Sequence, residues 1–320
     1  MRRLEDEQPK QSPYLALSPP SGFRRNPAQS ICGVVFGAGI RSSSKNALLL
    51  ARWEDWPKNI ILPEVATYII EERARRSAKK GFPLHKYIHH GLSSQAMLFN
   101  LVGPLMVRQD LAPLEISFGR NNIPWPDGQM NASLEYENRS VFKEDVGQPT
   151  SIDLIIQDES GSPRIFIEAK LAEREFGGCS VFSAGDCDGQ NPTGNFSLCY
   201  LHHIGRRYWE LLKTYAFLDG PIGKEATCIL SVHYQFFREV LFALEMDCTF
   251  VLLYDERNPT FIWEGPLGKR GLMPLLLSFV PDDLHDRVTM LSVQQVVWAI
   301  NSTGRHEWIE KFESKYGLSI

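Results

Sequence analysis

The sequence predicts an α/β protein whose central β-sheet is flanked by helices. Short segments of strand-like alternation lie at 151–157, 164–170, 226–233 and 249–254. Segments with helical periodicity lie before and between them, the longest at 63–80, 199–218 and 236–245. Strands separated by helices indicate a sheet with both faces covered. A chain of 320 residues is long enough to bury a sizeable core.

The bulk composition is typical of a soluble globular protein. The chain is 43% hydrophobic and 22% charged, with a formal net charge of -4. Because an acidic chain is on average repelled by phosphate, nucleic-acid binding would depend on local basic patches. No apolar run reaches membrane-spanning length, and the N-terminus lacks the apolar core of a secretory signal. Six cysteines without an export signal favour a reducing, cytoplasmic location.

The N-terminal part of the chain predicts an arm followed by a helix. Residues 1–45 are rich in Pro, Ser, Gly and Arg and predict an irregular arm, which leaves 46–320 as a single domain. The first helix is expected at 63–80, because Pro63 suits a first turn and Gly81 suits a stop.

The second helix begins at Ser93 or Ser94, whose side chains are good caps, and ends at Gly103-Pro104. The other expected elements are an apolar segment at 111–118, strands at 133–138 and near 261, and helices at 293–300 and 307–316.

The segment 151–170 predicts an antiparallel hairpin. Its two strands flank a turn at 158–163, which carries Gly and Pro. Because side chains alternate across a strand, Glu168 and Lys170 share one face. On the first strand the side chain of Asp153 is expected on the face opposite to that of Ile152, Leu154 and Ile156. If the apolar sets face the core, Asp153, Glu168 and Lys170 converge on the remaining face.

This convergence suits metal-assisted hydrolysis. Two neighbouring carboxylates can hold Mg²⁺, which prefers oxygen ligands, and the carbonyl of Ala169 would be a further ligand. The ion polarises a phosphodiester, and Lys170 can orient the attacking water and offset the charge that develops on the phosphate. The alternative is a surface hairpin with a solvated Glu168–Lys170 pair. An acid inside an apolar strand, with an aspartate on the preceding strand and a polar loop at 173–198, favours the metal site.

The hairpin also resembles the signature of a known nuclease superfamily. Ile152-Asp153 followed by Ile165-Phe-Ile-Glu-Ala-Lys170 is similar to the PD-(D/E)XK, or restriction-endonuclease-like, signature. The segment from Ser93 to Asn100 with Gly103-Pro104 resembles a bacterial branch of that superfamily, and the resemblance covers about 90–316. It implies a central mixed sheet flanked by helices, with cleavage of DNA dependent on Mg²⁺ or Mn²⁺ and of a restriction or defence kind. Asp153, Glu168 and Lys170 are the residues that it implies for catalysis.

The resemblance leaves one metal ligand open. Many members of the superfamily add a carboxylate on the helix before the hairpin, whereas this helix offers Gln95 and no acid. Glu135 and Glu137, on one face of the preceding strand, are the natural substitutes, although both fit a solvated face equally well. Gln95 is retained as a candidate contact to nucleic acid.

Further basic residues are candidate phosphate contacts. On the helix predicted at 199–218, Arg206, Arg207 and Lys213 could grip phosphates, or could form a solvated face with Glu210. Tyr208 and Trp209 on that helix are expected to pack. For two other sets of residues we favour a solvated or structural role. One is the basic run Arg73, Arg75, Arg76, Lys79 and Lys80, and the other is the histidine group His85, His89 and His90.

A group of cysteines follows the hairpin. Cys179, Cys187 and Cys199 with His202 could hold Zn²⁺ or an iron–sulfur cluster, as some nucleases of the superfamily do. No CxxC pair is present among them, so unrelated thiols are the simpler interpretation.

Two functions from different classes therefore stay open. The first is a deoxyribonuclease with DNA as partner, a homodimer for cutting both strands, and a specificity or motor subunit. The second is a catalytically inactive module with the same fold that binds nucleic acid or a protein partner. The acidic net charge and the missing helix acid favour the second, whereas a complete Asp-Glu-Lys set favours the first.

Overall fold

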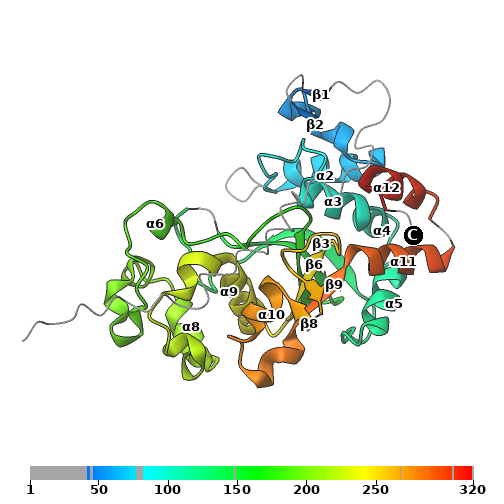
Figure 1. The fold of residues 1–320 in the computed structure, drawn as a ribbon. Coiled ribbons are helices and arrows are strands. Elements are labelled where there is room, and N and C mark those ends of the chain that lie inside the picture. The colour runs from blue at the N-terminus through cyan, green and yellow to red at the C-terminus, as the bar shows by residue number, and fades with distance from the viewer. Residues whose placement is uncertain are drawn as a thin grey trace, which may run out of the picture.

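A five-stranded mixed sheet forms the centre of the protein, in the strand order β3-β4-β5-β6-β9 (Figure 1). The computed structural model describes residues 42–43, 46–76, 82–147, 149–266, 268–304 and 306–318. Strands β3 (Asn131–Glu137), β4 (Ser151–Gln157) and β5 (Pro163–Lys170) pair antiparallel. Strands β6 (Thr249–Tyr254) and β9 (Val288–Ser292) continue the sheet parallel to β5. The predicted α/β fold with a mixed sheet is confirmed.

Helices cover both faces of this sheet (Figure 1). The first face packs on α2 (Pro63–Arg75), α3 (Ser94–Leu101), α4 (Gly103–Val107), α5 (Ala112–Arg120), α11 (Val293–Thr303) and α12 (Ile309–Tyr316). The second face packs on α8 (Tyr208–Thr214), α9 (Ile229–Glu245) and α10 (Leu272–Leu277). Each face buries its own apolar cluster, so β6 sends Val251 and Leu253 into the first cluster and Phe250 and Leu252 into the second.

Two of the N-terminal helices, α2 and α3, begin at the residues whose types favour a helix start. Pro63 opens α2, and the hydroxyl of Ser93 accepts the N–H of Ala96 to cap α3. Residues 42–43 and 46–50 form a small antiparallel pair, β1 (Ser42–Ser43) and β2 (Asn46–Leu50), so strand structure begins inside the predicted arm. The rest of that arm, 1–41 and 44–45, lies outside the described residues, as do Lys79, Lys80 and Gly81.

The strand predicted at 226–233 is wrong, because residues from Ile229 onward belong to α9. Leu230, Phe237, Val240 and Leu244 recur at helical spacing and are all buried in the second cluster. The helix bends at His233, whose φ of -126° and ψ of 33° are not helical. A short apolar run alone does not distinguish the end of a helix from a strand.

The helix predicted at 199–218 is also wrong, since it is interrupted. Gly205 adopts a left-handed φ of 83° and separates α7 (Tyr200–His203) from α8, and η6 (Phe217–Asp219) follows α8. Tyr208 and Trp209 are buried as expected. The preceding polar loop contains α6 (Ser180–Ser183) and the short turns η4 (Pro192–Gly194) and η5 (Phe196–Leu198).

Strand β9 is a fifth strand that the sequence pattern did not predict. The strand expected near 261 is the first arm of a small hairpin of β7 (Trp263–Gly265) and β8 (Gly268–Arg270). Short helical turns complete the chain at η3 (Trp53–Asn59), η7 (Pro221–Gly223) and η8 (Asp282–Arg287). Among the described residues, no helix is both long and apolar enough to cross a membrane.

Candidate active site

Three carboxylates stand in one row across the antiparallel half of the sheet. Strand β4 keeps a regular register with β3 from Gln157, and with β5 from Ile156, as far as Leu154. Continuing both registers by one position places Glu135 of β3 and Glu168 of β5 on either side of Asp153. Directly opposed residues of neighbouring strands lie only about 5 Å apart at Cβ. The sheet therefore places these three acids at neighbouring positions on adjacent strands.

The backbone is irregular at this row. Glu135 adopts a left-handed φ of 52°, which is unusual for a residue other than glycine. Leu154 and Ile156 pack in the first apolar cluster, whereas Ile152 packs in the second. The expectation that these three side chains share one face is therefore wrong at Ile152. The alternation reverses at the row, because the strands are not regular there.

Arg76, directly after α2, supports the irregular backbone. Its guanidinium donates hydrogen bonds to the carbonyl oxygens of Leu134 and Glu135, at 2.8 Å and 2.6 Å. The same group lies 5.0 Å from the ring centre of Phe82. Its position within a basic run predicts a solvated role, whereas in the structure its guanidinium is hydrogen-bonded to the backbone of β3.

Gln95 holds the side chain of Glu135. Its Nε2 donates to Oε1 of Glu135 at 2.5 Å, and the hydroxyl of Ser151 donates to Oε2 at 2.9 Å. Burial raises the pKa of Glu135 to about 8, although these two hydrogen bonds oppose the rise. The amide of Gln95 also bonds the backbone of Pro83 and His85. The candidate nucleic-acid contact is thus a buried amide engaged within the protein.

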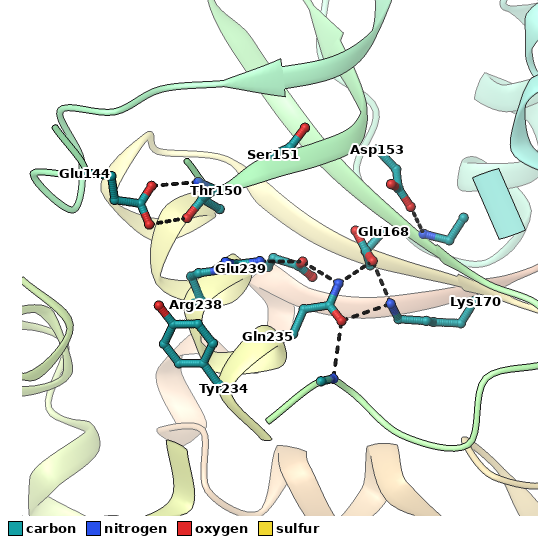
Figure 2. Close-up of polar contacts among 12 residues, drawn as sticks. Glu144, Thr150, Ser151, Asp153, Glu168, Lys170, Tyr234, Gln235, Arg238 and Glu239 are labelled. Carbon is teal, nitrogen blue, oxygen red and sulfur yellow. Dashed lines mark hydrogen bonds and ion pairs between the residues drawn. The ribbon is translucent and has the colours of Figure 1, made fainter. Parts of the chain in front are cut away.

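Asp153 stands between the other two acids. Its Oδ2 accepts the backbone N–H of Ala169 at 3.0 Å, which fixes the carboxyl against β5 (Figure 2). Burial raises the pKa of Asp153 well above its usual range, and the charges of Glu168 and Glu135 raise it further. The ammonium of Lys170 and the N–H of Ala169 oppose the rise. An acid in this position gains from a nearby cation.

Glu168 and Lys170 form a buried ion pair. Nζ of Lys170 lies 2.7 Å from Oε1 of Glu168, and the side chains are 8% and 5% exposed respectively. Burial lowers the pKa of Lys170, but the charges of Glu168, Glu239, Glu173 and Asp153 outweigh it and raise the pKa above its ordinary value. Lys170 is therefore an ammonium group and not a free base.

Gln235 of α9 bridges this pair to a buried acid. Its Oε1 accepts from Nζ of Lys170 at 3.1 Å and from the N–H of Gly177 at 3.4 Å. Its Nε2 donates to Oε1 of Glu168 at 2.7 Å and to Oε1 of Glu239 at 2.8 Å (Figure 2). Burial raises the pKa of Glu239 to about 8, and the charge of Glu168 adds to the rise. The four contacts fix which way the amide points, because a reversed amide would set its NH₂ against the ammonium.

Sequence reasoning missed Gln235 and Glu239. Gln235 falls between the strand predicted at 226–233 and the helix predicted at 236–245, so it was assigned to no helix face. The available signal was the spacing of four between Gln235 and Glu239 inside an apolar helix. Polar side chains at that spacing share one face, and here that face meets the Glu168–Lys170 pair.

The other predicted site residues lie outside the row. Glu137 pairs opposite Ser151, beyond Glu135 on the same strand. Arg206 donates to the carbonyl oxygens of Lys143 and Val146. Arg207 donates to Glu210, Glu245 and the carbonyl of Val141. Lys213 is exposed on α8. Within the described residues none of the three basic side chains hydrogen-bonds to Asp153, Glu168 or Lys170.

The three cysteines of the possible zinc or cluster site lie in the polar loop and directly after it. Cys179 and Cys199 precede α6 and α7, and Cys187 accepts the N–H of Gly189. In the part of the chain that the structure describes, no three side chains of His, Cys, Asp and Glu gather closely enough to hold a metal ion. This applies to His202 with the cysteines and to the acidic row alike. An ion at the row would also draw on backbone oxygens and water, as Mg²⁺ commonly does.

The remaining basic and histidine candidates have structural contacts. Arg73 lies 5.9 Å from the ring centre of Trp53, and Arg75 pairs with Glu72 at 2.6 Å. Nδ1 of His85 accepts the N–H of Tyr87, and Nδ1 of His90 accepts the N–H of Leu92. The side chain of His89 is half-buried in the same loop.

Comparison with protein families gives one match. The model of the family described as "Restriction Endonuclease associating with ARP" matches residues 36–317, which is most of the chain and includes the whole sheet. Searches of curated proteins and of solved structures give no significant match. The family match agrees with the mixed sheet flanked by helices. This chain is a member of the family of restriction endonucleases associating with ARP.

Proposed function

We propose that this chain is a metal-dependent nuclease that hydrolyses phosphodiester bonds of DNA. The observation that carries the proposal is the row of Glu135, Asp153 and Glu168 with the ammonium of Lys170 beside it. In the proposal Asp153, Glu168 and the carbonyl of Ala169 bind Mg²⁺ or Mn²⁺. Glu135 is the acid that the helix before the hairpin does not supply.

The electrostatics of the row support a divalent cation. Burial and mutual repulsion raise the pKa values of Asp153 and Glu135, and a divalent cation at the row would favour the charged form of both acids. The donor set consists of oxygen atoms only, which is the set that Mg²⁺ prefers. When bound, such an ion supplies Lewis-acid polarisation of the phosphodiester and lowers the pKa of a bound water.

The residues of the chain position the reacting groups. Glu168 and Gln235 hold the ammonium of Lys170 in one place, where its charge can stabilise the phosphate as negative charge develops. Because Lys170 is protonated, it serves as a hydrogen-bond donor and not as the base. The N–H of Ala169 fixes the carboxyl of Asp153, so that Asp153 and Glu168 face the same space.

A cleavage assay tests this function. Purified wild-type protein should nick or cut supercoiled DNA in Mg²⁺ or Mn²⁺ and not in EDTA. Asp153→Asn and Lys170→Met should each lower the rate by about 10²-fold or more, because each removes a charge that acts on the phosphate or its metal. Asp158→Asn is the matched control, since Asp158 belongs to the same hairpin but pairs with Arg164 at the turn.

Equal rates for wild type, Asp153→Asn and Lys170→Met, after controls for contaminating nucleases, would refute the proposal. That result would favour the alternative of an inactive module that binds nucleic acid or a protein.

The description of the family also names a partner. It states an association with ARP, and we extend the proposal to a complex of this chain with a partner of that description. Such a partner would supply DNA targeting that an acidic chain lacks over most of its surface. Addition of that partner to the cleavage assay should raise the rate or change the set of sites cut, and an unchanged rate and pattern would contradict this extension.

A further inference from the structure

Arg238 on α9 is a largely buried cation without a hydrogen-bond partner. Its side chain is 22% exposed, and the nearest acid, Glu239, lies 4.0 Å away at Oε1. Its Nε is covered from solvent and bonds to nothing, and within the described residues no hydrogen bond to this guanidinium is found. Burial of a charge is costly unless the charge is paired and hydrogen-bonded.

Two other partly buried arginines are hydrogen-bonded within the protein. Arg257 binds both carboxylate oxygens of Asp255 and two carbonyls near the C-terminal end of α12. Arg287 donates to the carbonyl of Cys248 and pairs with Asp247 at 3.1 Å. Both of these guanidinium groups therefore have hydrogen-bond acceptors within the described part of the protein, which Arg238 lacks. Among the residues described, Arg238 is instead held only by a long ion pair with Glu239 and by the ring of Tyr234, and its buried Nε donates to no acceptor.

A chain of hydrogen bonds holds the site around Arg238. The guanidinium lies 5.2 Å from the ring centre of Tyr234, one helical turn earlier. The hydroxyl of Tyr234 donates to that of Tyr208 at 2.5 Å, and Tyr208 donates to Oε1 of Glu144 at 2.8 Å. Glu144 in turn accepts the N–H and hydroxyl of Thr150, at 2.6 Å and 3.0 Å (Figure 2).

This arrangement lies beside the proposed catalytic row. Arg238 and Gln235 are three residues apart on α9, a spacing that places side chains on neighbouring positions of one helix surface. Gln235 contacts both Glu168 and Lys170. At the other end, Thr150 directly precedes β4, the strand that carries Asp153. The guanidinium therefore stands one helical turn from the residue that binds the catalytic pair (Figure 2).

A phosphodiester matches the chemistry of this position. A guanidinium is a planar fork of donors that binds the oxygens of a phosphate in pairs. Neither neighbouring acid forms a hydrogen bond with the guanidinium. Both oxygens of Glu144 already accept hydrogen bonds from Thr150 and Tyr208. Glu239 makes only a long contact of 4.0 Å with the guanidinium, and its Oε1 already accepts a hydrogen bond from Gln235.

We propose that Arg238 is a phosphate-binding subsite for the DNA backbone, adjoining the position of the scissile phosphodiester. This inference rests on the proposed nuclease function. It adds to that function a side chain that binds the backbone of the DNA strand to be cut. It also gives the acidic protein a local cation at the place where the substrate must lie.

DNA-binding measurements with three variants test the subsite. Fluorescence anisotropy would follow a labelled duplex at several salt concentrations, with Ca²⁺ in place of Mg²⁺. Arg238→Met should weaken binding about 5- to 30-fold and reduce the slope of log Kd against log salt by about 1, as expected for one lost phosphate contact. Arg238→Lys should retain the slope.

Arg287→Met is the matched control. The side chain of Arg287 is 29% exposed, but it is satisfied by protein groups at the start of β9, the end of the sheet away from Lys170. This variant should bind DNA as the wild type does. In thermal unfolding Arg238→Met should match or exceed the wild-type Tm, because it removes a buried charge that makes no hydrogen bond within the described residues, whereas Arg287→Met should lower it.

The outcomes separate this inference from the proposed function. If the wild type binds duplex and Arg238→Met binds with the same affinity and salt slope, the subsite is wrong and the proposed function stands. If Arg238→Met lowers Tm and leaves DNA binding unchanged, Arg238 is structural and the subsite is wrong. Failure of the wild type to bind any duplex would instead contradict the proposed function, and the subsite with it.

Discussion

At the scale of single residues, the site depends on one unusual backbone conformation. Glu135 adopts a left-handed φ of 52° in the middle of β3, and this turns the strand so that its carboxyl joins Asp153 in the row. A side chain in that conformation costs on the order of 1 kcal/mol relative to an ordinary strand. The two hydrogen bonds from Arg76 to the carbonyls of Leu134 and Glu135 offset this cost.

Arg76 is therefore expected to stabilise the site from outside. Arg76→Gln should lower the free energy of unfolding by about 2 kcal/mol, because it removes two hydrogen bonds from a charged donor to partly buried carbonyls. It should also reduce cleavage through displacement of Glu135. Urea unfolding followed by fluorescence measures the first effect, and the cleavage assay measures the second.

The neighbouring residue provides the control for that prediction. Arg75 is exposed and pairs only with Glu72 on the same helix, so Arg75→Gln should leave both unfolding and cleavage unchanged. Equal effects of the two substitutions would show that Arg76 acts only through charge and not through its contacts with β3.

The acids that form the row could be predicted only in part. Glu168 and Lys170 followed from their separation by two residues in a strand, and Asp153 followed from the register of a short hairpin. The sequence could not decide whether Glu135 or Glu137 is the third acid of the row. The answer depends on a left-handed φ that the sequence Leu-Glu-Tyr-Glu does not indicate. The role of Arg238 could not be predicted, since a lone arginine on an apolar helix gives no signal of the hydrogen bonds that it lacks in the described part of the fold.

At the scale of elements, helix α9 contributes most to the site after the hairpin. It carries Gln235, Arg238 and Glu239 on one flank and buries Phe237 and Leu241 on another. Its first turns were taken for a strand because 226–233 is short and apolar, and such runs fit either structure until packing decides. The boundary error had a functional consequence, because it removed Gln235 from the helix on which its role depends.

The helix predicted at 199–218 shows the opposite error. The apolar pattern around Tyr208 and Trp209 extends smoothly in both directions, but Gly205 breaks it with a left-handed φ. Arg206 and Arg207 consequently lie at the start of α8, where they bind carbonyls and carboxylates of the protein. Tertiary contacts of this kind cannot be read from helical spacing alone. The basic side chain that we assign to phosphate binding, Arg238, comes instead from α9.

At the scale of the whole molecule, two apolar clusters bury the sheet and confine its polar groups to one end. The hydrophobic pattern predicted this arrangement well, because buried strands with helices on both faces have a strong signature. Strand β9 escaped prediction, since it is short and lies at the edge of the sheet. The low-dielectric surroundings of the row explain why the pKa values of its acids rise.

This burial predicts a pH dependence of stability. Burial raises the pKa values of Glu135 and Glu239 to about 8, from an ordinary value of 4.5. Between these values the folded protein holds more protons than the unfolded chain, so the free energy of unfolding falls as pH rises. In EDTA the Tm should therefore decrease from about pH 5 to about pH 8, and Glu239→Gln should make the decrease smaller.

Magnesium should reverse part of that loss. An ion bound to the row requires deprotonated acids, so Mg²⁺ should raise Tm more at pH 8 than at pH 5. Differential scanning calorimetry at both pH values, with and without Mg²⁺, measures the difference. A rise of equal size at both pH values, or an EDTA curve that climbs toward pH 8, would contradict this electrostatic description of the row.

A crystal structure of the protein soaked in Mn²⁺ tests the central claim most directly, because anomalous scattering locates the ion independently of any assay. We expect one strong peak bound by an oxygen of Asp153 and an oxygen of Glu168, at distances of about 2.0 to 2.3 Å, with the carbonyl of Ala169 alongside. Asp153→Asn should abolish or greatly weaken the peak. An ion-free row at millimolar Mn²⁺, or a peak held by other residues only, would contradict the assignment of Asp153 and Glu168 as a metal site.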